Sequence, residues 1–121
     1  MADTRGLIET GVRRFLEEVP ALQPLKLPFA LELRGRGDVQ LYRVAMPGPE
    51  ITKDLRGDER ARLIVTRSHF NELAEKGSVR DWHRAFENGH AKAEGPTEIL
   101  RLIANVVEKQ EERDRTRKAR H

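Results

Sequence analysis

The segment from Ala85 to Gly95 constrains the fold of this chain more than any other stretch. Its sequence is Ala-Phe-Glu-Asn-Gly-His-Ala-Lys-Ala-Glu-Gly, and Pro96 follows at once. Gly89 can adopt the positive φ that lets a helix turn directly into a strand, and Gly95 lets that strand turn into another helix. Proline suits the first position of a helix, where its missing N–H costs nothing. The segment therefore predicts a helix, a short strand over residues 90–94 and a final helix in immediate succession.

Apolar residues recur every three to four positions in four segments, which predicts four helices. The first helix lies around residues 7–19 and stops at Pro20, and two short helices follow around residues 68–76 and 79–88. Between the short helices we expect Gly77 in the left-handed conformation. The fourth helix is the final one described above. Its apolar positions are Ile99, Leu100, Ile103, Val106 and Val107. Ser78 and Asp81 have the spacing of a capping box at the start of the third helix.

Alternating apolar and polar residues predict strands at residues 29–34, 39–46 and 61–66, with a short edge strand within residues 50–55. The second of these carries apolar residues on both faces, which suggests cover on both sides or a cavity beneath one. The order is helix, three or four strands, two short helices, a strand and a helix. We therefore predict a single α+β domain over residues 1–107, with a mixed or antiparallel sheet of about five strands covered by helices.

Composition and charge narrow the classes of function. A chain of 121 residues suits one domain, and the absence of cysteine excludes disulfides and thiolate chemistry. No run approaches the ~18 apolar residues of a membrane span, so we expect a cytoplasmic protein, for which transient membrane contact stays open. Residues 108–121 form a charged helical extension or tail with six basic and four acidic residues. Arginine outnumbers lysine 17 to 6, which fits a bacterial GC-rich genome.

No catalytic or metal-binding constellation is evident in the sequence. Glu87 and His90 have the Glu-x-x-His spacing of di-iron bundles, but it occurs once and Gly89 breaks the helix that would orient both side chains. Ser68 and His69 are adjacent on a helix and point apart, so they do not form a nucleophile–base pair. We therefore predict no enzyme activity, no metal and no cofactor.

From Ala61 to Val107 the sequence resembles the type-2 sterol carrier protein family. The shared features are the Ala85-Phe86 pair, a glycine, a few alternating residues, and a second glycine before the closing helix. Upstream, Leu63-Ile64-Val65-Thr66 followed by Phe70 and Leu73 is similar to the strand and helix that precede this segment in the family.

The resemblance implies a curved sheet covered by helices, with an apolar tunnel between them that takes sterols, fatty acids or acyl chains. Binding would then come from burial, at about 0.8 kcal/mol per CH₂. The chain departs from the family at Ala91 and Ala93, where larger aliphatics are common; small residues there could widen a tunnel or let the final helix collapse onto the sheet. Pro96-Thr97-Glu98 replaces the family's small-aliphatic run, and the last residues are not the peroxisomal address of some members.

Eight apolar residues on the covering helices are candidate ligand contacts. Trp82 has two interpretations, because it either packs in the core with Phe86 or borders a ligand cavity. The apolar stripe of the final helix is ordinary packing unless a tunnel exists, in which case part of it lines that tunnel. The candidates are Phe70, Leu73, Trp82, Phe86, Ile99, Leu100, Ile103 and Val106.

Our leading hypothesis is the non-catalytic binding of an apolar small molecule or lipid. The alternative is a protein-interaction or homodimerisation module on the same fold, with a filled cavity and exposed apolar surface. A third idea is nucleic-acid binding through the basic tail, but the four acidic residues interleaved there argue against it. The basic residues in question are Arg113, Arg115, Arg117, Lys118 and Arg120.

Overall fold

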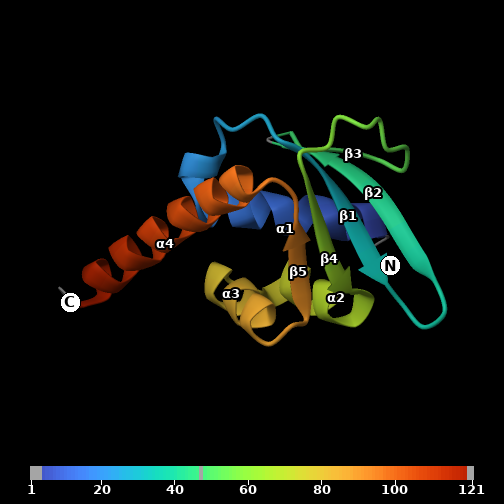
Figure 1. Cartoon of the computed structure of the whole chain (residues 1–121). Coiled ribbons are helices and arrows are strands. Elements are labelled where there is room, and N and C mark those ends of the chain that lie inside the picture. Colours follow the sequence, from blue (N-terminus) through green and yellow to red (C-terminus); the bar gives the residue numbers. More distant parts are fainter. Residues whose placement is uncertain (1–3, 47, 120–121) are drawn as a thin grey trace.

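The computed structural model describes residues 4–46 and 48–119 (Figure 1). The elements in chain order are α1 (Thr4–Glu18), the 3₁₀ turn η1 (Pro20–Leu22), β1 (Pro28–Arg34), β2 (Val39–Ala45), β3 (Glu50–Thr52), β4 (Ala61–Thr66), α2 (Arg67–Lys76), α3 (Val79–Glu87), β5 (Ala91–Glu94) and α4 (Thr97–Ala119). This order confirms the predicted α+β class, with five strands in one mixed sheet and four α-helices among the described residues. None of these helices is both long and apolar enough to cross a bilayer.

The sheet has the strand order β3-β2-β1-β4-β5. The central strand β1 pairs antiparallel with β2 and parallel with β4, so Leu31 lies beside Tyr42 on one side and Leu63 on the other. A parallel pair needs a crossover connection, and here residues 53–60 carry the chain from β3 at one edge past β2 and β1 to β4. This register sets which side chains of β1, β4 and β5 share a face.

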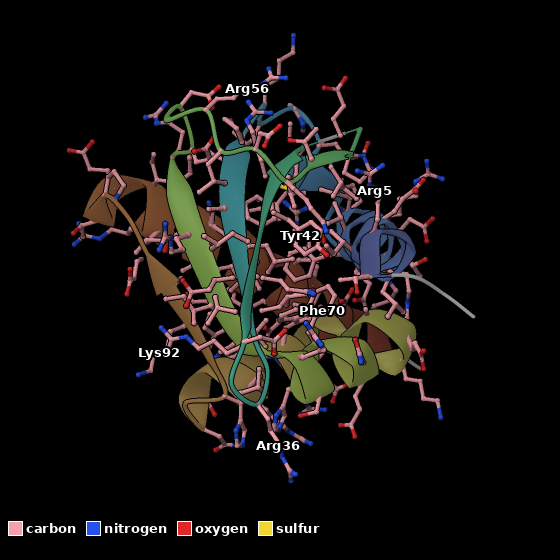
Figure 2. All side chains as sticks on the ribbon, turned by 90° about the vertical axis from the view of Figure 1, so that its right-hand side faces the viewer. Arg5, Arg36, Tyr42, Arg56, Phe70 and Lys92 are labelled. Atoms are coloured by element: carbon pink, nitrogen blue, oxygen red, sulfur yellow. The ribbon has the colours of Figure 1, made fainter. Side chains whose placement is uncertain are left out.

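Helices α1 and α2 cover one face of the sheet. Figure 2 shows Tyr42 and Phe70 between the sheet and these helices, whereas Lys92 points away from the opposite face. Burial of this face is close to complete near β1 and β2, where Leu33 and Val44 have no exposed surface. The main core cluster consists of Ile8, Leu31, Leu33, Tyr42, Val44, Val65, Phe70, Leu73, Ala74, Trp82, Ala85 and Ala91.

The opposite face of the sheet is held by a buried arginine. The guanidinium of Arg43 donates to Asp58 at 2.8 Å and to Glu59 at 3.2 Å, both on the crossover connection. Glu59 also accepts the backbone N–H groups of Arg56 and Gly57. Through its hydrogen bond, Arg43 holds the pKa of Asp58 below its ordinary value, and Asp58 in turn raises the pKa of Arg43. The crossover is therefore fastened to β2 by charge-assisted bonds.

Two local turn predictions had different outcomes. Gly89 has a φ of +79°, as expected where α3 turns into β5, and Ser78 and Asp81 form the predicted capping box. The Ser78 backbone N–H donates to Asp81 and lowers the pKa of that carboxyl. The prediction for Gly77 was wrong, because its φ is −74°, in the extended region. Glycine is needed there for space: a Cβ would lie 2.6 Å from the carbonyl oxygen of Leu73.

We expect Gly77→Ala to lower the free energy of unfolding by about 1–3 kcal/mol, the usual cost of forcing an atom into an overcrowded site. The clash outweighs the small stabilisation that alanine brings by restricting the unfolded chain. Urea unfolding followed by circular dichroism measures the change. Lys76→Ala, at the exposed neighbouring position, is the control and should change stability by no more than about 0.5 kcal/mol. A Gly77→Ala variant as stable as the parent would contradict the steric explanation.

Candidate ligand-binding pocket

An apolar pocket of about 400 Å³ lies between the sheet and the helices. Figure 1 shows α4 leaving the end of β5 and running away from the sheet, with α3 below it. The pocket wall from α1, η1, the sheet and two residues that flank its strands consists of Ile8, Gly11, Val12, Phe15, Leu22, Leu27, Phe29, Leu31, Met46, Ala61, Arg62, Leu63 and Ala93. The wall from α2, α3 and α4 consists of Phe70, Val79, Trp82, His83, Phe86, Leu100, Ile103, Ala104, Val107 and Glu108.

Small side chains on the sheet leave this space open. Ala61 at the start of β4 and Ala93 on β5 both line the pocket, and Ala93 stands opposite Leu63 in the β4–β5 pair. A methyl group reaches far less deeply towards the helices than the leucine or valine found elsewhere on this face. Ala104 on α4 is equally small and also lines the pocket. The pocket thus separates α4 from Ala93 on β5. Ala91, the other inward residue of β5, lies nearer the core and is buried.

Three aromatic rings form one end of the pocket. Trp82 on α3 meets Phe15 on α1 and Phe70 at the start of α2 edge to face, with ring centroids 6.5 Å and 6.2 Å apart. Trp82 and Phe70 are also members of the main core cluster. The two interpretations of Trp82 therefore coincide, since the ring is buried and one side of it borders the pocket. Phe86, one turn further along α3, is 40% exposed.

The structure brings five of the eight candidate residues to this pocket: Phe70, Trp82, Phe86, Leu100 and Ile103. Leu73 lies instead in the main core cluster, and Ile99 is half-buried away from the pocket wall. Val106 packs against a second cluster around Leu16 and Val19. These three residues lie on α2 and α4, as do three of the five that line the pocket, but at neighbouring positions of each helix.

Sequence reasoning missed the half of the wall that comes from α1 and the strands. Ile8, Val12 and Phe15 belong to the apolar stripe of the first predicted helix, so the signal for their burial was present. That stripe shows that a helix face is buried but not what it packs against. The charged groups at the rim, His83 and Glu108, were missed because each looked like an exposed helix residue.

The pocket wall contains three ionisable residues, and one of them is directed elsewhere. Arg62 alternates along β4 with Ala61 and Leu63, which face the pocket. Its guanidinium pairs with Glu32 at 3.3 Å, on the opposite face of the sheet. Arg62 therefore contributes its main chain to the wall, and its positive charge serves the outer surface.

His83 joins α3 to α4 at the rim of the pocket. Its Nδ1 lies 3.1 Å from Glu111 on α4, and its Nε2 lies 3.1 Å from Glu87 one turn along α3. Carboxylates only accept hydrogen bonds, so the doubly protonated ring satisfies both partners. The bond to Glu111 raises the pKa of His83, with further contributions from the charges of Glu87 and Glu108, while partial burial lowers it.

The pocket wall presents mainly apolar side chains. Among the described residues, the side chains on the wall include no hydroxyl, lysine or aspartate group. No group of three metal-ligating side chains occurs in the described ranges 4–46 and 48–119. His69 and His90 stack with ring centroids 4.0 Å apart, and Nδ1 of His69 bonds to Thr66. Apart from the rim, the pocket offers a ligand only apolar contact.

No protein-family model matches the sequence, and no curated protein does so either. Solved structures do match. The palmitated sterol carrier protein 2-like 2 of Aedes aegypti superposes with a TM-score of 0.56 at 16% identity, over 83% of this chain and 93% of that one. Sterol carrier protein 2 of Yarrowia lipolytica, in its apo form, gives 0.55 at 16% identity, over 88% and 91%. Sterol carrier protein-2 like-3 of Aedes aegypti gives 0.56 at 12% identity, over 96% and 99%.

These similarities cover nearly the whole of each solved structure compared, so they concern the complete domain and not one shared motif. At such low identity they establish architecture. They agree with the resemblance detected in the segment from Ala61 to Val107. The chain has the fold of sterol carrier protein 2.

Proposed function

We propose that this protein binds an apolar small molecule or lipid in the pocket between sheet and helices, without catalysing a reaction. The observation that carries the proposal is the unfilled apolar space of about 400 Å³. It lies within the range of ~300–1,000 Å³ that is usual for small-molecule sites. The similarity to a palmitated protein of the same fold supports the same conclusion.

The energetics favour a ligand with a long aliphatic part. Burying about ten methylene groups gains about 8 kcal/mol, whereas association costs about 4–15 kcal/mol in lost freedom of motion. A short apolar molecule would therefore bind weakly in this pocket. Each further methylene group that the pocket buries adds about 0.8 kcal/mol, so affinity rises with the length of the aliphatic part even without a polar contact.

The same observation weighs against the alternative of an interaction module with a filled cavity, because the space is open.

Nucleic-acid binding gains no support either. Arg113, Arg115 and Arg117 are exposed on α4, but Asp114 lies between the first two and accepts a hydrogen bond from Gln110. The side chain of Lys118 and all of Arg120 lie outside the described residues.

α4 is the part of the wall that we expect to move when a ligand enters. It contacts α3 and η1 but makes few contacts with the sheet, and Figure 1 shows its second half projecting from the rest of the molecule. The ion pair between His83 and Glu111 is one of the contacts that hold it in place. Loosening this contact would open the pocket without unfolding the sheet.

We expect Ala104→Phe to weaken ligand binding by at least about tenfold, because the larger ring occupies the pocket itself. The test is native mass spectrometry of protein purified from cells, followed by titration with a fluorescent acyl probe. Asn105→Phe places the same ring on the next residue, which is exposed and outside the wall, and should bind the probe as the parent does. The proposed function would be contradicted if the parent protein neither copurified with an apolar ligand nor bound the added acyl probe.

The stability provided by the α3–α4 contact should depend on pH. Because the folded pKa of His83 is raised, the contact stabilises fully below the unfolded value of about 6.5 and is lost as pH rises through the folded pKa. Glu111→Gln should therefore lower the free energy of unfolding at about pH 5.5 and have little effect at about pH 8.5. Urea unfolding at both values measures this, with Glu112→Gln as control. Equal losses at both values would show that Glu111 acts through packing alone.

A further inference from the structure

Among the described residues that line the pocket, no cationic side chain is free to meet a ligand. Of the ionisable residues on the pocket wall, Arg62 places its guanidinium against Glu32 on the far face of the sheet, at 3.3 Å. His83 has both ring nitrogens within 3.1 Å of a carboxylate, one from Glu87 and one from Glu111.

Carboxylates dominate the same rim. Glu108 lies on the pocket wall itself, and Glu87 and Glu111 flank His83. Three carboxylates therefore face a single imidazole. Among these four side chains, negative charge exceeds positive charge even when His83 is protonated, and the excess is larger when His83 is neutral.

We propose that this pocket selects amphiphiles whose polar end is a hydrogen-bond donor without negative charge, such as a hydroxyl or ammonium group, and disfavours free carboxylates. The inference rests on the proposed function and specifies its ligand class. An aliphatic chain buried among apolar walls brings its polar end to the rim, because the walls offer that end no partner. A hydroxyl there can donate to Glu108, whereas a carboxylate meets like charge.

Binding of an anion at the rim would also disrupt a contact between two helices. An anionic head group favours a cation, and His83 is the cationic side chain of the pocket wall that does not point to the far face of the sheet. To bond to it, the anion must displace Glu111 or Glu87. Displacing Glu111 breaks the contact that joins α3 to α4, so binding an anion would loosen the wall that encloses the ligand.

The experiment compares three ligands of equal chain length: 1-dodecanol, dodecanoate and dodecylamine. Trp82 is the one tryptophan of the chain and borders the pocket, so its fluorescence reports binding directly. At about pH 8, where the carboxylic acid is ionised, we expect dodecanol to bind at least about tenfold more tightly than dodecanoate, and dodecylamine at least as tightly as dodecanol.

Glu108→Gln should strengthen dodecanoate binding by about threefold or more, since it removes the repulsion. It should weaken dodecanol binding slightly, because a neutral amide oxygen is a weaker acceptor than a carboxylate, so the ratio of the two affinities shifts towards dodecanoate. Glu112→Gln, one turn further along α4 and exposed, removes the same charge away from the wall. That control should change neither affinity.

The outcomes separate the two proposals. If dodecanoate binds as tightly as dodecanol, the charge selection is overturned and ligand binding stands. If Glu108→Gln leaves the ratio of the two affinities unchanged, the rim does not discriminate by charge and the inference fails. If none of the three ligands alters Trp82 fluorescence or appears in native mass spectra, the proposed function fails and the selection with it.

Discussion

The pocket depends on a change in side-chain size across the face of the sheet that the helices cover. Under α1 and α2 that face carries residues such as Leu33 and Val65, which are almost wholly buried. Towards α4 it carries Ala61 and Ala93. Protein interiors are normally packed as densely as organic crystals, so a helix would be expected to approach until such a space closed. α4 does not, and the reason lies in the contacts at its start and near its middle.

α4 is fixed on either side of the pocket and crosses it between those points. At its start, Gly95 lies so close to the beginning of β4 that a Cβ would stand 3.0 Å from the carbonyl oxygen of Arg60. Three turns along, Val106 and Val107 pack against the second apolar cluster, and Glu111 reaches His83. An α-helix is a rigid rod over this length, so the part between the two points spans the space rather than bending into it.

Local features of this fold were predictable from sequence, while contacts between distant segments were not. The positive φ of Gly89 follows from a helix that must turn directly into a strand. Gly77 was mispredicted because spacing does not distinguish a glycine needed for φ from one needed to clear the carbonyl of Leu73. The rim was missed because His83 and Glu111 are 28 residues apart, and only the crossing of α3 and α4 makes them partners.

In the function that we propose, affinity and selectivity come from different parts of the same pocket. The apolar walls stabilise any chain in proportion to the area that it buries, so they discriminate little between one lipid and another. The rim is where ligands differ, and its groups also fasten α4. A head group that bonds to Glu108 leaves the contact between His83 and Glu111 in place, whereas one that requires His83 competes with it. In this arrangement the choice of ligand and the closure of the pocket depend on one set of charges.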